Sequence, residues 1–384
     1  MTASIKLGRI AGVQIGVNWS VLIIFGLVTG ALSFNYFPDL YPNRSLLTYV
    51  FAGLVLAGVF FAGLLAHEVS HAIVAQRNGI AVESITLWLL GGVAVLRGQP
   101  RTPGAQVRIA GIGPLVSLAI GLVFTTMCFG LAMIGQTGMI FGAFVWLAAI
   151  NIALALFNLL PATPLDGGRL LCAGLWRMRG DRYWAAKFAA RCGQGLGLLF
   201  VGLGLWQVLS HGRASSLWLA FVGWFVLIAA QSEERQASIG KALAGVRMDE
   251  VMSSNPETAP ATMSIAEFVR THMWNTRCRT FPLMLNNSPV GLVSLKKLRK
   301  ISRERWEITQ LREVSQPLAQ FTLATPEEFV PDVLLRMGGR PDGRIFVVND
   351  GQLVGIVSPA DINKAVERAE LRLRAGSAPF VSVK

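Results

Sequence analysis

Leu64-Leu65-Ala66-His67-Glu68-Val69-Ser70-His71 places two histidines and a glutamate directly after an almost unbroken apolar run that begins at Tyr49. Ionisable side chains are expensive in hydrocarbon, so such a cluster inside a membrane helix indicates a functional site. Residues four apart share one face of a helix, so His67 and His71 can hold one metal ion. Glu68 lies about 100° around the helix from His67, close enough to act as a base on a water molecule there.

The composition indicates an integral membrane protein. Of the 384 residues, 53% are hydrophobic and 15% are charged, with a mean hydropathy of +0.51, whereas a soluble protein carries about 25% charged residues. The four cysteines show no paired spacing, so we expect neither a disulfide framework nor a zinc knuckle. The net charge is +13. Because the basic residues are spread over loops and the C-terminal third, we interpret them as topology signals and solvated surface, and expect no nucleic-acid partner.

Six spanning helices are expected, over residues 17–37, 47–76, 107–135, 139–161, 187–209 and 215–232. The first segment is too long for a signal peptide and is expected to remain as a span. One set of connecting segments holds most of the positive charge, on Lys6, Arg9, Arg77, Arg97, Arg101, Arg108, Arg169, Arg177, Arg179, Arg182 and Lys187. The opposite set holds only Arg44 and Arg213. The positive-inside rule therefore predicts that both termini and the two long connections lie in the cytoplasm, with the metal site toward the cytoplasmic end of the second helix. We expect a multi-pass protein of a prokaryotic inner membrane.

The composition changes after Gln231, and the remainder contains an internal repeat. An offset of 64 residues aligns Thr258 with Thr322 and Met273 with Met337. Each copy is predicted to form a helix, two strands across a polar turn, and a second helix. We therefore expect a membrane domain over residues 1–236, repeats over 246–305 and 306–372, and a tail over 373–384. The repeats form a soluble α/β module on the cytoplasmic side.

Two histidines leave a catalytic zinc ion one protein ligand short, because it usually takes three and a water. Asp166 is the strongest candidate, in the stretch Pro161-Ala162-Thr163-Pro164-Leu165-Asp166-Gly167-Gly168 after the fourth span. The second and fourth helices both run toward the cytoplasm, so their ends meet at similar depth. The two prolines break the helix and free backbone groups to line a polar cavity. The alternative for Asp166-Gly167-Gly168 is a simple turn. Asn158 either bridges helices or contacts substrate.

Residues from Val82 to Leu96 are predicted to form a small β-hairpin with Gly91-Gly92 at its turn. A spanning substrate must unwind before hydrolysis, and the hypothesis is that the hairpin edge pairs with it as an added strand. The alternative is a hairpin that only packs on the membrane surface. The fifth span contains five glycines, which serve close helix packing or a mobile helix pair that gates substrate entry: Gly193, Gly195, Gly197, Gly202 and Gly204.

The motifs together resemble the signature of the site-2 protease family of intramembrane zinc metalloproteases. They are His67-Glu68-Val69-Ser70-His71, Asn158 with Pro161, Leu165-Asp166-Gly167, and Gly111-Ile112-Gly113-Pro114. The resemblance covers about the first 230 residues. It implies that His67, His71 and Asp166 hold one zinc ion per chain and that Glu68 is the catalytic base. It also implies an endopeptidase that cuts membrane-spanning protein substrates within the lipid bilayer.

The repeat resembles a pair of cystathionine-β-synthase (CBS) domains, modules that often bind adenine nucleotides. The stretch Gly355-Ile356-Val357-Ser358-Pro359-Ala360-Asp361 matches their final strand-to-helix turn, where Ser358 and Asp361 can meet a ribose and phosphates. The first copy has Lys297 in place of Asp361, so at most one site is expected. The alternative is a module without ligand that forms a homodimer.

Two other functions remain open from the sequence. One is a metal transporter or channel gated by its CBS pair, in which His67, His71, Glu68 and Asp166 bind the transported ion; this association is fold-level only. The presence of Glu68 favours hydrolysis, since a transport site needs no base beside its ligands. The other is a non-catalytic scaffold. The fold class expected is thus a polytopic α-helical membrane protein with a small β-hairpin and a soluble α/β CBS pair.

Overall fold

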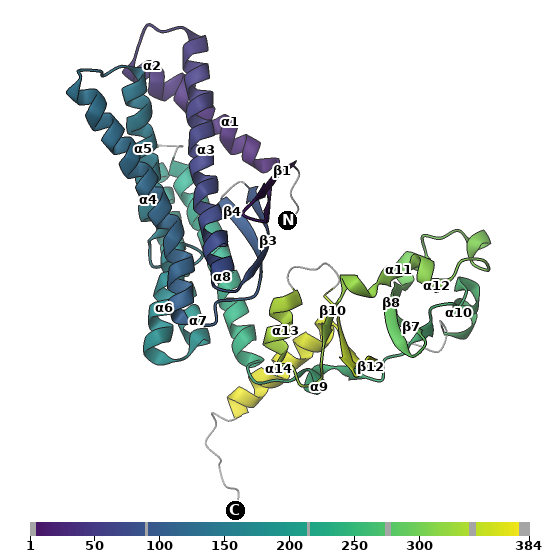
Figure 1. Cartoon of the computed structure of the whole chain (residues 1–384). Coiled ribbons are helices and arrows are strands. Elements are labelled where there is room, and N and C mark those ends of the chain that lie inside the picture. Colours follow the sequence, from purple (N-terminus) through teal and green to yellow (C-terminus); the bar gives the residue numbers. More distant parts are fainter. Residues whose placement is uncertain (1–4, 89–90, 213–215, 273–277, 338–342, 376–384) are drawn as a thin grey trace, which may run out of the picture. The chain divides into compact units, whose positions relative to one another are not determined.

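The computed structural model describes residues 5–88, 91–212, 216–272, 278–337 and 343–375 (Figure 1). The chain divides into two compact units, Met1–Ser238 and Ile239–Lys384. Arg213 and Met273, named above, lie outside the described residues, as do Leu89 and Leu90 near the tip of the predicted hairpin. The same holds for residues 376–384 of the expected tail.

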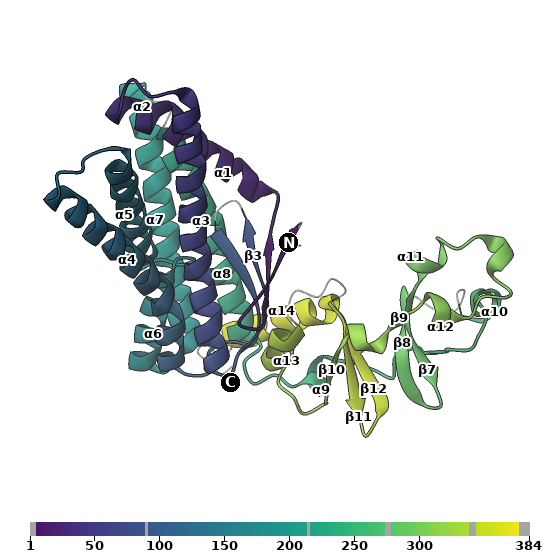
Figure 2. The ribbon, with the colours of Figure 1, turned by 45° about the horizontal axis from the view of Figure 1, so that its top comes forward.

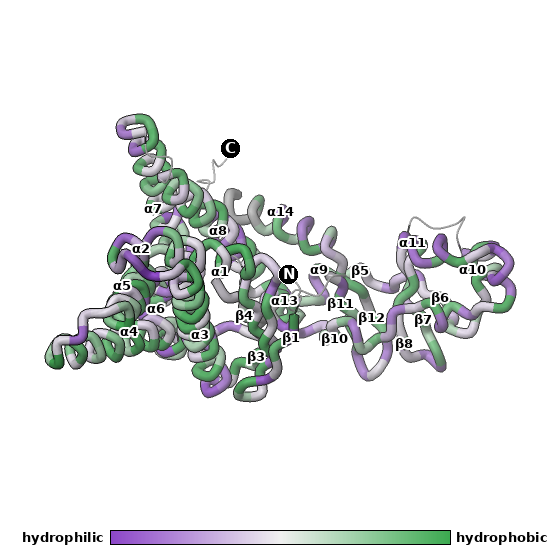
Figure 3. Tube along the Cα trace, turned by 90° about the horizontal axis from the view of Figure 1, so that it is seen from above, coloured by the Kyte–Doolittle hydropathy of each residue, from purple (hydrophilic) through white to green (hydrophobic). Residues whose placement is uncertain are grey.

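Six helices among the described residues are long and apolar enough to cross a membrane, which confirms the expected number of spans. They are Ser20–Leu40, Leu46–Arg77 (α3), Pro103–Met133 (α4), Met139–Asn158 (α5), Arg182–His211 (α7) and Leu217–Ala242 (α8). The first of them consists of α1 (Ser20–Ala31), the π-helical turn η1 (Leu32–Tyr36) and α2 (Phe37–Leu40). Hydrophobic residues predominate along α3, α4 and α5 in Figure 3.

Polar side chains fix the starts of α3 and α4, the two helices that meet at the metal cluster described below. At the start of α3, the Thr48 N–H donates a hydrogen bond of 3.2 Å to Ser45 Oγ. At the start of α4, the Ala105 N–H donates a bond of 3.2 Å to Thr102 Oγ1. Each bond satisfies a backbone N–H that has no partner inside its helix. The helix starts therefore help to set the position of the side chains further along.

A helix outside the six spans, α6 (Asp166–Arg179), follows α5 after the break at Pro161 and Pro164. The charge pattern predicts a connection between the fourth and fifth spans for these residues. The structure instead forms a helix with one buried face, on Asp166, Gly167, Gly168, Cys172 and Ala173. Small side chains allow this face to pack on α4 and α7. Because α6 begins at Asp166, the start of the helix fixes the position of that carboxylate.

Four strands of the first unit form a sheet in the order β1-β2-β3-β4. They are β1 (Ile5–Ile10), β2 (Val13–Val17), β3 (Ala81–Trp88) and β4 (Gly91–Arg97). The β1/β2 and β3/β4 pairs are antiparallel, and β2 pairs with β3 in parallel. Val13 and Ile85 of the sheet pack in one core cluster with Ala72 and Ala75 of α3, so the sheet lies beside the end of α3 that carries the histidines (Figure 2).

The sheet corrects two expectations. Lys6 and Arg9 lie in β1, a strand that the sequence analysis missed because all six of its residues are exposed and its alternation is weak. The β-hairpin itself is confirmed, but Gly91 and Gly92 are the first residues of β4 and pair with the end of β3 instead of forming the turn.

Glycines bring α7 close to its neighbours. A Cβ atom at Gly193 would overlap the Thr163 carbonyl oxygen, in the segment that leads to α6. At Gly197 and Gly204 a Cβ would meet the backbone of α8 at 2.8 and 2.6 Å. The remaining two glycines of this span have nothing within 4 Å. The packing interpretation therefore fits three of the five glycines.

The last spanning helix continues past the charged residues that were expected to end it. The stretch Ser232–Gln236 lies inside α8, which runs to Ala242. Charged side chains end the apolar segment but do not break a helix, because Glu, Arg and Gln are good helix formers. Leu243, the next residue, is fully buried in a core cluster of the second unit. The chain thus enters that unit directly from a helix.

The second unit contains two four-stranded sheets, in the orders β6-β7-β8-β9 and β10-β11-β12-β5. The first repeat supplies α9 (Met248–Val251), β5 (Ser253–Ser254), β6 (Ala259–Pro260), α10 (Ile265–Thr271), β7 (Thr280–Leu285), β8 (Ser288–Ser294), α11 (Leu295–Leu298) and η3 (Arg303–Arg305). The second supplies α12 (Leu311–Val314), β9 (Gln316–Pro317), η4 (Leu318–Gln320), β10 (Thr322–Ala324), α13 (Val330–Met337), β11 (Ile345–Asn349), β12 (Gln352–Val357) and α14 (Pro359–Ala375). The predicted order of helix, strand pair and helix is confirmed in both copies.

Each repeat gives one short strand to the sheet of the other. β5 of the first copy pairs with β12 of the second, and β9 of the second pairs with β8 of the first. The offset of 64 residues did not predict this exchange, because β5 and β9 contain only two residues each. Neither sheet is complete without the other copy.

We predict that Gly193→Ala destabilises the membrane unit, because the new Cβ would collide with the rigid Thr163 backbone. Overpacking of this kind costs about 1–3 kcal/mol. Gly195→Ala, two residues along the same helix and with nothing within 4 Å, is the matched control. Unfolding of both purified variants in detergent measures the difference. Equal stability of the two variants would contradict the packing role.

Candidate active site

One face of α3 carries two imidazoles that point to the same place. His67 is buried and His71 is half-buried. Their Nε2 atoms are 3.2 Å apart, and their ring centroids are 4.8 Å apart. The spacing of four residues on a helix brings the rings together, as the sequence predicted.

The neighbouring helix α4 holds the other nitrogen of each ring. His67 Nδ1 lies 2.9 Å from Ser117 Oγ, and His71 Nδ1 lies 2.6 Å from the Ile109 carbonyl oxygen. A carbonyl only accepts, so His71 Nδ1 carries a proton, and in the neutral ring the lone pair is then on Nε2. The sequence did not predict this role for Ser117; the available signal was a hydroxyl side chain in a strongly apolar helix, four residues after Gly113.

Asp166 meets both imidazoles from the start of α6. Its Oδ2 lies 3.3 Å from His67 Nε2 and 3.3 Å from His71 Nε2. The chain can bend here because Gly167 and Gly168 pack on backbone; a Cβ at Gly168 would lie 2.7 Å from the Ala162 carbonyl oxygen. The structure therefore brings together the three side chains that the sequence analysis singled out as ligands.

Gly113 of α4 faces this cluster and leaves space in it. A Cβ built on Gly113 would lie 2.6 Å from His67 Nε2 and would overlap His71 Nε2. Aromatic rings cannot move aside as a flexible chain end can. Any larger residue would therefore fill the space between the donor atoms, so the glycine keeps that space open.

The donor set fits a tetrahedral zinc ion. Zinc bonds of about 2.0–2.1 Å place two donor atoms of a tetrahedral site roughly 3.3 Å apart. The three separations here are 3.2, 3.3 and 3.3 Å. Two imidazole nitrogens and a carboxylate oxygen are also ligands that catalytic zinc takes, with a fourth position left for water. His67, His71 and Asp166 are, among the described residues, the one cluster of this kind.

Glu68 lies beside the cluster and contacts the sheet. Its Oε1 accepts a hydrogen bond of 3.2 Å from the Gly92 N–H of β4. Glu68 thus lies in α3, and its side chain is hydrogen-bonded to the edge strand of the sheet. Gly91, the other hairpin glycine predicted to bind substrate, is the adjacent residue of the same strand.

Asn158 does not join the cluster. It lies in the last turn of α5, half-buried, and its Nδ2 donates 3.1 Å to the Leu154 carbonyl of its own helix. Within the described residues, no hydrogen bond links it to His67, His71 or Asp166.

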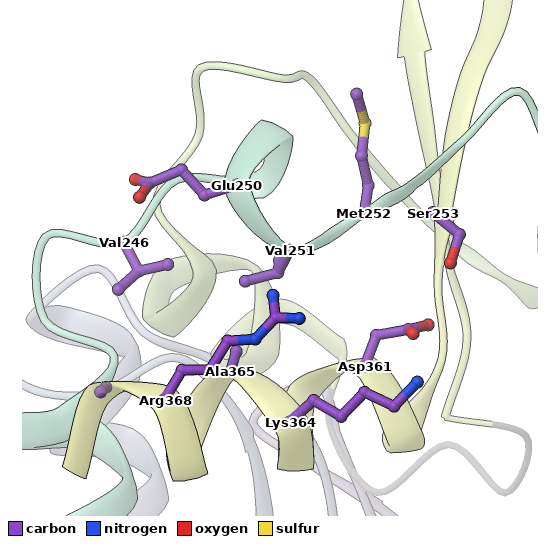
Figure 4. Close-up of a pocket in the computed structure, with 10 residues that line it drawn as sticks. Val246, Glu250, Val251, Met252, Ser253, Asp361, Lys364, Ala365 and Arg368 are labelled. Atoms are coloured by element: carbon purple, nitrogen blue, oxygen red, sulfur yellow. The ribbon is translucent and has the colours of Figure 1, made fainter. Parts of the chain in front are cut away.

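A separate pocket of about 270 Å³ lies in the second unit, lined by residues of both repeats (Figure 4). It is lined by Val246, Glu250, Val251, Met252, Ser253, Asp361, Lys364, Ala365, Arg368 and Ala369. Figure 4 shows Asp361, Lys364 and Arg368 rising from α14 on one side of it. Ser358 is not in the lining; its N–H and Oγ donate to Asp361 Oδ2 at 2.9 and 2.6 Å.

Comparison with known proteins identifies both units. The family described as Peptidase family M50 matches residues 55–137 and 130–202, and the CBS domain matches residues 248–304 and 312–368. Zinc metalloprotease Rip3 of Mycobacterium tuberculosis is 39% identical over 369 residues, covering 96% of this chain and 94% of that protein. The chain belongs to peptidase family M50, the site-2 proteases.

Other relatives of this M50 peptidase are also similar along its whole length. A zinc metalloprotease of Synechocystis is 31% identical, with 96% of both chains covered. A zinc metalloprotease of Methanocaldococcus jannaschii is 28% identical, with 97% of this chain and 98% of that one covered. Among solved structures, the site-2 protease of M. jannaschii matches with 31% identity and a TM-score of 0.43, over 60% of this chain and 94% of that chain.

Family membership confirms several expectations. The M50 peptidase is a zinc metallopeptidase of the membrane, which acts on membrane proteins in a lipid environment, and it carries a CBS pair. The enzymatic interpretation therefore replaces the transporter and the non-catalytic scaffold. The roles of individual residues do not follow from membership alone and are taken up below.

We predict that Ser117→Ala weakens zinc binding by about 10–100-fold, the usual cost of removing a partner that orients a histidine ligand. Thr125→Ala is the control, because Thr125 lies two turns further along α4 and its Oγ1 bonds only the Gly121 carbonyl of its own helix. Competition against a chromogenic chelator measures both affinities. Wild-type affinity in Ser117→Ala would contradict the orienting role of this hydroxyl.

Proposed function

We propose that His67, His71 and Asp166 hold one zinc ion and that Glu68 is the general base of an intramembrane endopeptidase. The observation that carries this proposal is the triangle of donor atoms, 3.2–3.3 Å on each side, with a carboxylate on the adjacent residue of the same helix. We assign this chemistry to residues 1–236, and regulation to the repeats over 246–305 and 306–372.

The chain's own groups divide the work of hydrolysis. When bound, zinc supplies Lewis acidity toward water and toward a peptide carbonyl. Glu68 takes a proton from the attacking water as the new C–O bond forms, and passes it to the leaving nitrogen as the C–N bond breaks. Ser117 and the Ile109 carbonyl hold the imidazoles in orientation throughout.

The substrate is a membrane-spanning protein segment, and we propose that it unwinds and pairs with the free edge of β4. The sheet order leaves β4 with no neighbour on one side among the described strands, and exposed sheet edges bind extended peptides. Gly91 and Gly92 open this strand next to Glu68, which supports their role in substrate binding. Asn158 can offer its amide to a substrate carbonyl only after it releases the Leu154 carbonyl.

We predict that Glu68→Gln keeps its zinc and loses cleavage of a single-span substrate in reconstituted membranes. The side chain keeps its shape but can no longer accept the proton, and general acid–base catalysis contributes about 10²–10⁴-fold. Glu83→Gln, at an exposed carboxylate of β3, is the matched control. Metal analysis and gel-based cleavage are measured on the same preparations, and undiminished cleavage by Glu68→Gln would refute the assignment.

We propose that both termini and the CBS pair are cytoplasmic, in the inner membrane of a prokaryotic cell. The support is the uneven distribution of arginine and lysine between the two sets of connecting segments. We also propose that two copies of the chain form a homodimer through their CBS pairs.

The pocket of the second unit supports control of the peptidase by an adenine nucleotide. Lys364 and Arg368 supply positive charge for phosphates, and Asp361 supplies a carboxylate for a ribose. Val246 and Glu250, on the opposite side, follow α8 closely along the chain. A bound nucleotide would therefore touch the segment that continues the last spanning helix. Control of cleavage requires that the nucleotide bind active and inactive arrangements with different affinity.

We predict that AMP, ADP or ATP raises the unfolding temperature of the purified M50 peptidase. Saturation at about 100 times the dissociation constant adds about 2.7 kcal/mol of stability. Asp361→Ala should abolish the shift, whereas Lys297→Ala at the equivalent position of the first repeat should keep it. No shift with any of the three nucleotides would favour the alternative of a dimerisation module without ligand.

A further inference from the structure

We propose that Gly92 is a positioning residue: its backbone N–H holds the Glu68 carboxylate in place for proton transfer. The inference rests on the proposed role of Glu68 as base. It starts from one contact, the hydrogen bond of 3.2 Å from the Gly92 N–H to Glu68 Oε1. This bond joins β4 to α3 across 24 residues of sequence.

The geometry of the hairpin explains why this N–H is available. Trp88 pairs with Gly91 across the two-residue connection, and Leu87 pairs with Gly92. The pair that closes a two-residue hairpin is hydrogen-bonded, and such pairs alternate with non-hydrogen-bonded ones. The Gly92 N–H therefore points away from β3, to the free edge of the sheet. Glu68 is the group that meets it there.

Glycine is required at position 92 for space, not for backbone conformation. A Cβ on Gly92 would lie 2.7 Å from Glu68 Oε2 and 2.5 Å from Glu68 Cγ. Gly91, in contrast, has a φ of +137°, while Gly92 is not among the residues with positive φ. Any side chain at position 92 would push the Glu68 carboxylate away from β4. Because the carboxylate is the end of a flexible chain, it can move without distortion of the strand.

The same edge gives Gly92 a place in substrate alignment. By the alternation of the strand, Ala94 also turns its N–H to the free edge. A substrate strand added along β4 would pair with Ala94. The following substrate residues would then lie beside Gly92 and the Glu68 carboxylate. One short strand thus aligns the peptide and positions the base. The bond to be cut is then set by register, at the substrate residue that faces Gly92.

The decisive variant is Gly92→Ala in the full chain, reconstituted in lipid nanodiscs with a single-span substrate. We expect kcat to fall by about 10²-fold, the scale of a misplaced reacting group, while zinc content and unfolding temperature stay at wild-type values. Gly174→Ala is the matched control, because Gly174 lies in α6 with nothing within 4 Å of its built Cβ. Wild-type kcat in Gly92→Ala would overturn the proposal.

A second variant separates positioning of Glu68 from a structural effect on β4. Glu68→Asp shortens the side chain and makes room for a Cβ at position 92. In a single-turnover assay, adding Gly92→Ala to Glu68→Asp should cost much less than in the wild type, because coupled residues are not additive. The same fold loss in both backgrounds would show that Gly92 does not act through Glu68.

The proposed function and this inference fail differently. If Glu68→Gln still cleaved the substrate, Glu68 would not be the general base, and the proposed function would fail. An inactive Glu68→Gln together with a fully active Gly92→Ala would leave the base in place and refute only its positioning by β4.

Discussion

Polar groups inside a membrane need hydrogen-bond partners from the protein itself. The contact between α3 and α4 supplies such partners for two histidines at once. His67 and His71 each place one ring nitrogen on α4 and turn the other toward Asp166. An imidazole with an unpaired nitrogen in hydrocarbon would cost several kcal/mol. The orientation that removes this cost is also the one that presents lone pairs to a metal. The same hydrogen bonds between α3 and α4 therefore stabilise the histidines in the membrane and orient them to bind zinc.

Glycines, which have no side chain, create the space for this arrangement. Gly113 lets α4 approach the imidazoles, Gly168 lets α6 begin beside the broken end of α5, and Gly193 lets α7 pack on the Thr163 carbonyl. Gly113 lies directly against the imidazoles, whereas Gly168 and Gly193 lie against the segment that leads to Asp166. Gly92 repeats the pattern at the base, where β4 lies directly on the Glu68 side chain. Close packing in a membrane depends on small residues, and here it also shapes the reactive centre.

The site could be predicted from sequence where chemistry and spacing coincide. His67, Glu68 and His71 share one helix, so their geometry follows from the helical repeat, and Asp166 follows from depth and from the shortage of other carboxylates. Ser117 could not be found in this way, because α4 is apolar on all sides and its rotation cannot be read from a periodic pattern. The strand β1 was missed because all six of its residues are exposed, so its sequence shows no alternation between a buried and an exposed face. The helix α6 was missed because its charged residues were interpreted as part of a loop between two spans.

The strand exchange between the repeats determines how the second unit unfolds. Since β5 completes the sheet of the second copy and β9 that of the first, loss of either copy leaves the survivor with an open edge. The two repeats therefore form one cooperative element. Unfolding of one copy also removes a strand from the sheet of the other, so we expect both copies to unfold together.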